Sequence, residues 1–84
     1  MSNKNLSEQE SALFYYFYHE VGLDKDVPIA VIHDKLYGNV ERDHKTKQQY
    51  IGSIVSKVNR KTDGYRIRPG EVKRTYRLVT ARAA

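Results

Sequence analysis

The sequence of 84 residues contains no cysteine, no tryptophan and only two prolines. The absence of cysteine excludes a disulfide framework, a thiolate nucleophile and every zinc or iron–sulfur site that needs cysteine ligands. No apolar run approaches the roughly 20 residues that a membrane-spanning helix needs. The first five residues also lack the apolar core of a signal peptide. We therefore expect a cytoplasmic protein with no membrane partner.

Apolar residues make up 39% of the chain and charged residues 30%, which is typical of a globular protein. A chain of this length forms a single domain. We expect that domain to span residues 1–84, with an ordered core from about residue 6 to residue 79. The first five residues and the tail from Thr80 to Ala84 are expected to be frayed ends.

The charge is divided unevenly along the chain. The formal net charge is +5, but residues 1–40 carry three cations and six anions, whereas residues 41–84 carry twelve cations and four anions. The first part therefore has a net charge of −3 and the second of +8. Such an asymmetry predicts one acidic and one basic face, and a basic face is typical of proteins that bind polyanions.

Two helices are predicted in the acidic part. The segment Ser7 to Glu10 has the pattern of a capping box, in which a serine and a glutamate satisfy each other's amide protons. Apolar residues then recur at helical spacing as far as Val21, before Gly22. A second helix should run from about Ile29 to Tyr37, after Pro28 and a short extended pair.

A third helix should begin after a cap at Asp43 or Thr46 and end near Lys61. Its apolar stripe has spacings of three and four residues: Ile51, Ile54, Val55 and Val58. The opposite face has no acidic residue. It carries the residue types that read base edges in the major groove, since Gln pairs with adenine and Arg or Lys with guanine. Gly52 costs about 1 kcal/mol relative to Ala in mid-helix, so a group that approaches the backbone closely is a possible reason for it.

The last part of the sequence alternates with period two, from Tyr65 to Arg68 and again from Arg74 to Val79, around a loop with Pro69 and Gly70. This pattern predicts a β-hairpin. Its arginines are expected to face water on one side of the ribbon: Arg66, Arg68, Arg74 and Arg77. Arginine is favoured where bidentate contact with phosphate matters.

Three segments resemble a known family. The segment Val27 to Gly38 resembles the second-helix segment of OmpR/PhoB-type winged-helix DNA-binding domains, which commonly ends Val-Trp-Gly. The segment Val55 to Lys61 is similar to the family's recognition-helix pattern Ile-Ser-x-Leu-Arg-x-Lys. Thr75 to Leu78 is similar to the Gly-Tyr-Arg-Leu that closes its wing. The likeness covers about Leu6 to Val79. Family members usually also carry a receiver domain and an N-terminal sheet, and we expect neither in this sequence.

The resemblance implies an α+β winged helix-turn-helix, with three helices followed by a C-terminal β-hairpin wing. It also implies a small stand-alone, phage- or plasmid-like protein that binds double-stranded DNA by sequence and regulates transcription. The third helix would enter the major groove and the wing would lie on the backbone. Candidates for base contacts are Lys45, Gln49, Ser53, Ser56 and Arg60. Candidates for phosphate contacts are Lys57, Arg66, Arg68, Lys73, Arg74 and Arg77.

An enzyme is not expected. The histidines lack the spacing of a helical zinc site, and neither a P-loop nor a G-x-S-x-G motif is present, so no metal and no cofactor is expected either. Because one recognition helix reads few base pairs, a homodimer or a cooperative array is expected on DNA, with Tyr15 and Tyr18 as candidate interface residues. The alternative is a winged helix that docks on a protein, such as a phage-type inhibitor of a host polymerase or nuclease.

Overall fold

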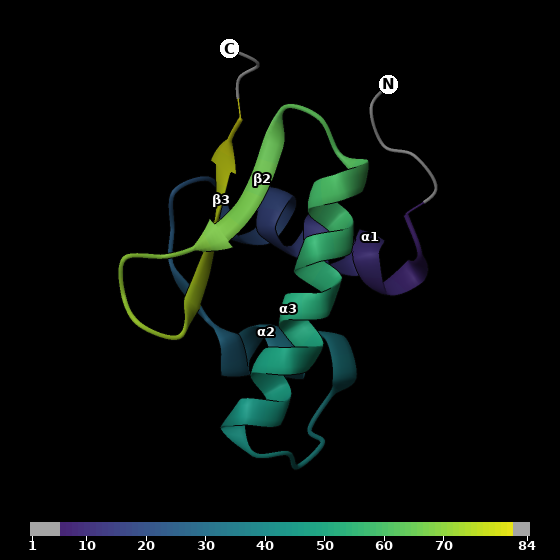
Figure 1. Ribbon diagram of the computed structural model, residues 1–84, viewed down its shortest axis with the longest axis vertical. Coiled ribbons are helices and arrows are strands. Elements are labelled where there is room, and N and C mark those ends of the chain that lie inside the picture. The colour runs from purple at the N-terminus through teal and green to yellow at the C-terminus, as the bar shows by residue number, and fades with distance from the viewer. Residues whose placement is uncertain (1–5, 82–84) are drawn as a thin grey trace.

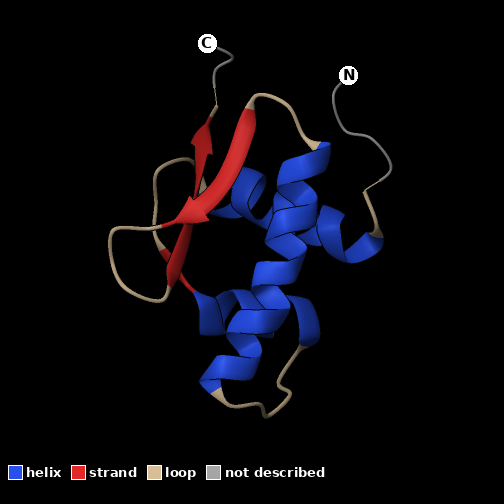
Figure 2. Cartoon of the chain, viewed as in Figure 1, coloured by secondary structure: helices blue, strands red, loops and turns tan. Residues whose placement is uncertain are grey.

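The computed structural model describes residues 6–81, in which helices lie to one side of a small sheet (Figures 1 and 2). The expectations for residues 1–5 and 82–84 lie outside this range. The elements are α1 (Glu8–Tyr15), η1 (Tyr16–Val21), β1 (Val27–Pro28), α2 (Ile29–Tyr37), α3 (His44–Lys61), β2 (Tyr65–Pro69) and β3 (Thr75–Thr80). The α+β class with three helices is confirmed, since α1 and η1 follow each other without a break, and the sheet is antiparallel and three-stranded.

The capping box starts α1 as the sequence predicts. Ser7 Oγ accepts from the Glu10 amide at 3.2 Å, and the Ser7 amide donates to Glu10 Oε1 at 3.0 Å. The α-helix ends at Tyr15 and continues as the π-helical segment η1. The segment stops at Gly22, whose φ of 98° lies in a region that residues with a side chain rarely adopt.

The hairpin of β2 and β3 is extended into a sheet by β1, in the order β1-β3-β2. Val27 pairs with Tyr76, and Ile67 pairs with Leu78 in the antiparallel register. The expectation that Thr80 and Ala81 belong to a frayed tail is wrong. Thr80 pairs with Tyr65, and the Ala81 amide donates to Gly64 O at 2.9 Å. The hydrogen bonds between β2 and β3 therefore continue to the turn that precedes β2.

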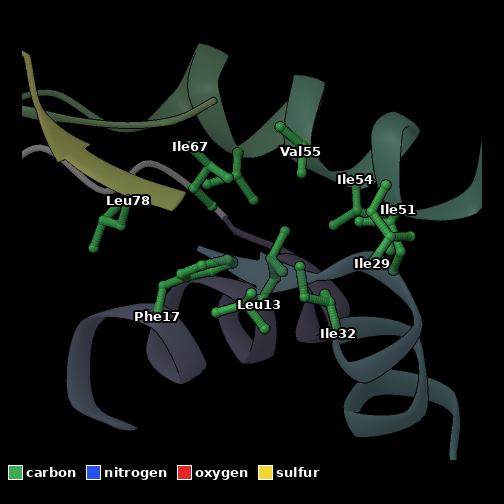
Figure 3. Packing of buried hydrophobic residues seen from close by; sticks show 11 residues of the cluster. Leu13, Phe17, Ile29, Ile32, Ile51, Ile54, Val55, Ile67 and Leu78 are labelled. Carbon is green, nitrogen blue, oxygen red and sulfur yellow. The ribbon is translucent and has the colours of Figure 1, made fainter. Parts of the chain in front are cut away.

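The core lies between α3 and the pair formed by α1 and α2 (Figure 3). The predicted stripe of α3 is buried throughout. It faces Leu13 and Phe17 from the first helical segment and Ile32 from α2, while Ile67 and Leu78 close the core on the side of the sheet. Burial of one stripe fixes the rotation of α3, so its opposite face points to solvent.

Within residues 6–81, no helix is long and apolar enough to cross a membrane.

Candidate nucleic-acid interface

The solvent face of α3 is the first part of the candidate site. Asp43 caps the helix, because its Oδ1 accepts from the Thr46 amide at 2.8 Å. These hydrogen bonds from Thr46 lower the pKa of the Asp43 carboxyl group. From His44 to Lys61 the helix contains no acidic residue. The side chains predicted to contact bases are all exposed on this face: Lys45, Gln49, Ser53, Ser56 and Arg60.

Arg42 lies in the loop before α3 and binds side chains of α2 and α3. Its guanidinium carbon lies 4.3 Å from the ring centre of Tyr50 and 5.2 Å from that of Tyr37. Arg42 Nη1 donates to Nε2 of the fully buried His33 at 2.8 Å. An imidazole nitrogen that accepts a hydrogen bond carries no proton, so His33 holds its proton on Nδ1, which faces Asp34 Oδ1 at 3.4 Å. His33 therefore positions the start of α3.

Asn59 joins α3 to the hairpin. Its Nδ2 donates to Ile67 O at 2.8 Å, and its Oδ1 accepts from the Ile67 amide at 2.8 Å. The side chain thus completes the ladder on the free edge of β2, and β2 runs beside α3 in Figure 1. In the sequence, Asn59 stands where the recognition-helix pattern of the OmpR/PhoB-type domains has arginine. No local signal shows that it pairs with a strand.

The hairpin presents cations on its outward face. Ile67 pairs with Leu78 in the core, so the flanking pairs point outward, and these place Arg66 opposite Val79 and Arg68 opposite Arg77. Arg66 and Arg68 are exposed. The prediction of four arginines on one face is wrong for Arg74, which precedes β3 in the loop with a φ of 62°.

The prediction that Arg77 faces water is also wrong. Arg77 Nε donates to Asp26 Oδ1 at 2.6 Å, and the Arg77 side chain is only 23% exposed. This hydrogen bond raises the pKa of Arg77 and is the main reason that the pKa of Asp26 is lowered. A guanidinium already paired with a carboxylate is a poor phosphate contact, since the phosphate would have to displace that partner. Arg77 is therefore structural.

Asp26 also shapes the hairpin loop. Its Oδ2 accepts from the amides of Glu71 and Val72, each at 3.1 Å. Thr75 Oγ1 donates to Val72 O at 2.6 Å, and the Gly70 amide donates to Thr75 O at 3.0 Å. The loop carries the exposed side chains of Lys73 and Arg74. Its backbone is thus held by a residue that precedes β1, far away in the sequence.

Some cations of the described chain have a partner inside the molecule, and others have none. Arg42, Lys61 and Arg77 form hydrogen bonds of 2.6–2.8 Å inside the molecule, and the Lys61 bond to Glu10 Oε1 is the main cause of the lowered pKa of Glu10. Lys35 pairs with Glu20 and Lys47 with Asp34 at longer distance. On α3 and the hairpin, the cations with no such partner among residues 6–81 are Lys45, Lys57, Arg60, Arg66, Arg68, Lys73 and Arg74.

A hollow of about 390 Å³ lies between α3 and the hairpin. It is lined by Lys45, Gln48, Gln49, Gly52, Ser53 and Tyr76. The period-two pattern of the hairpin predicts that Tyr76 faces the core, and its ring does pack against the core. Burial raises the pKa of its hydroxyl group, which lies near Gly52. The sequence does not indicate that Tyr76 borders this surface.

Tyr15 on α1 and Tyr18 on η1 belong to an exposed aromatic cluster. Tyr18 stacks on Phe14 with a centroid distance of 5.6 Å and meets Tyr65 edge-on at 5.3 Å. The hydroxyl group of Tyr65 donates to that of Tyr18, and this hydrogen bond raises the pKa of Tyr65 because it stabilises the protonated form. Tyr15 stacks on His19 at 4.6 Å, and Tyr15 is 60% exposed. Tyr18 is therefore partly engaged in the fold, whereas Tyr15 is free to meet a partner.

No metal centre was found in the part of the chain that the structure describes, because no three side chains of ligand type come together there. No family model, curated protein or solved structure was found to match the chain. The likeness to OmpR/PhoB-type domains stays a prediction of the sequence.

Proposed function

We propose that this chain binds double-stranded DNA as a winged helix-turn-helix module, with α3 in the major groove and the hairpin on the backbone. The observation that carries the proposal is the solvent face of α3, which offers amide, hydroxyl and cationic groups with no acidic residue among them. A helix with this face reads base edges, and cations without internal partners attract phosphates. The element order and the sheet order β1-β3-β2 are those expected of a winged helix.

The proposed binding is specific for DNA sequence, as in transcriptional regulators. The unpaired cations of α3 and the hairpin lie on adjoining elements, so one duplex can meet both. A helix in the groove contacts base edges, while a twisted ribbon beside it contacts mostly phosphates. Gln49, Ser53 and Ser56 would then contribute specificity, and Arg66, Arg68 and Lys73 would contribute affinity.

Salt dependence tests the proposal. If about five cations neutralise phosphates, the logarithm of the binding constant should fall against the logarithm of salt concentration with a slope of about −4 to −5. Fluorescence anisotropy with a mixed-sequence duplex, from low to physiological salt, measures this slope. Arg66→Ser with Arg68→Ser should make it shallower by about 2. Lys35→Gln on α2 removes one charge outside the interface and should leave it unchanged.

A protein-docking role is the second candidate, and the exposed aromatic cluster around Tyr15 favours it. The same titration separates the two functions. A flat response to salt, or no binding at low salt, would contradict DNA binding and favour docking on a protein partner.

A further inference from the structure

Gly52 stands near the middle of an 18-residue helix, where a glycine weakens the helix relative to alanine. Its backbone does not require glycine, since its φ is not in the positive range. Packing does not require it either. A methyl group at this position would meet only the Tyr76 hydroxyl oxygen, at 3.6 Å, which is an ordinary van der Waals distance. The protein's own structure therefore leaves the glycine unexplained.

Gly52 borders the hollow between α3 and the hairpin, so a bound group in that hollow would explain the glycine. The hollow is open to solvent and has a volume of about 390 Å³, so it can admit a group as large as a phosphodiester. Lys45 and Tyr76 both border it. Within residues 6–81, the Lys45 ammonium has no ion-pair partner and the Tyr76 hydroxyl has no hydrogen-bond partner.

We propose that the sugar-phosphate backbone of one DNA strand crosses this hollow, with Gly52 as the point where it lies against the bare surface of α3. The inference rests on the proposed function and adds a contact to it. A helix in the major groove and a ribbon beside it must straddle the strand that separates them, and the hollow lies between those two elements. Lys45 and Tyr76 then donate to phosphate oxygens, as lysine and tyrosine side chains do in protein–DNA interfaces.

The position of Gly52 on the helix supports a backbone contact rather than a base contact. Gln48, Gly52 and Asn59 form the flank of α3 that faces the hairpin, and Asn59 binds β2 directly. The base-reading candidates Gln49 and Ser53 border this hollow too, but they also border a second hollow on the other flank of α3, so they lie nearer the middle of the solvent face. A side chain at position 52 would hold the strand away from the helix, and this would reduce binding to every sequence.

Gly52→Ala and Gly52→Leu test the proposal, together with Tyr76→Phe. Gly52→Ala should raise the melting temperature by about 4–8 °C, the usual shift for 1 kcal/mol in a domain of this size. The same variant should weaken binding about tenfold on all duplexes, because the added methyl group overpacks the contact, and Gly52→Leu should weaken it further. Tyr76→Phe should lose about threefold to tenfold, the value of one hydrogen bond.

Two matched variants serve as controls. Ser11→Ala also introduces a better helix former, but on α1. Tyr16→Phe also removes a tyrosine hydroxyl group, but on η1. Neither variant should change DNA affinity. If Gly52→Ala and Gly52→Leu bind like the wild type, the inference is wrong while the proposed function stands. It is also wrong if Gly52→Ala lowers the melting temperature, or if the loss is confined to one duplex sequence. If the wild type itself shows no salt-dependent binding, the proposed function fails first.

Discussion

Asp26 is the residue on which the shape of the hairpin loop depends most. Its carboxylate accepts from two loop amides and from Arg77. Gly70 lies so close that a methyl group there would collide with the side chains of Asp26 and Thr75. A side chain at position 70 would therefore displace Asp26 from its hydrogen bonds to Arg77 and to the loop amides. The loop that carries Lys73 and Arg74 is built around one ionised carboxyl group.

The ionisation of Asp26 predicts a dependence of stability on pH. The Arg77 hydrogen bond lowers the pKa of Asp26, and the Lys61 hydrogen bond lowers that of Glu10. A group whose pKa is lowered by folding contributes stability that is present above its ordinary pKa, near 4, and is lost as the pH falls through the lowered value. Thermal melts should therefore show that the contribution of these two carboxylates to stability is present above about pH 4 and is lost progressively at lower pH.

Asp26→Asn separates this contribution from general acid unfolding. The variant should melt at a lower temperature than the wild type at pH 7, and the difference should shrink towards pH 2. Asp63→Asn changes an exposed carboxylate with no ion-pair partner among the described residues, so its pH profile should follow the wild type. A difference between Asp26→Asn and the wild type that stays the same at every pH would show that the charge does not hold the loop.

Among the elements, α3 and the hairpin have different parts in the proposed complex. Gln49 is uncharged and exposed, so it adds little to binding that does not depend on sequence. Arg68 is exposed on the outward face of β2, where the proposed complex would bring phosphates next to it. The two side chains thus provide a matched pair for separating base reading from backbone binding.

The pair makes a prediction with opposite signatures. Gln49→Ala should cost about 1–3 kcal/mol on the preferred duplex and little on a scrambled one. Arg68→Ala should weaken both duplexes about equally and make the salt slope shallower by about 1. Binding constants for both duplexes at two salt concentrations measure these effects. If Arg68→Ala alone loses discrimination, the hairpin reads sequence and α3 holds the backbone.

For the whole molecule, size limits what one copy can recognise. Its longest dimension is 38 Å, close to the roughly 34 Å of one turn of duplex DNA, and one recognition helix reads only a few base pairs. Specific binding in a genome therefore favours more than one copy on the site. Tyr15 is the aromatic residue we choose for such a contact, because it is 60% exposed and, within residues 6–81, the only ring that stacks on it is that of His19.

Tyr15→Ser should accordingly reduce cooperative binding on a long duplex while leaving the melting temperature nearly unchanged. Tyr18→Ser is a poorer test, because Tyr18 also packs on Phe14 and Tyr65. Gel shifts that compare one-site and two-site duplexes measure the cooperativity. Val31→Ser removes an exposed apolar side chain from α2 and is the control. Equal cooperativity in Tyr15→Ser and the wild type would place the contact elsewhere.

Much of the fold is readable from local sequence patterns. The capping box at Ser7, the cap at Asp43 and the bounds of α2 all match the structure, because capping and helical periodicity involve residues within four positions of each other. The exposed face of α3 follows in the same way from its buried stripe. For this reason the exposure of the candidate base contacts could be predicted from the sequence, while their role as base contacts stays a prediction.

The parts that sequence reasoning missed depend on partners that are distant along the chain. Arg77 pairs with a carboxylate 51 positions away, and Tyr76 approaches Gly52 across the gap between β3 and α3. A period-two pattern places Arg77 on the outward face of a strand, but it carries no information on which acid lies beside that face. Local periodicity therefore specified which side of each element is buried. Packing of the elements against one another settled which charged groups are neutralised inside the molecule and which remain for a ligand.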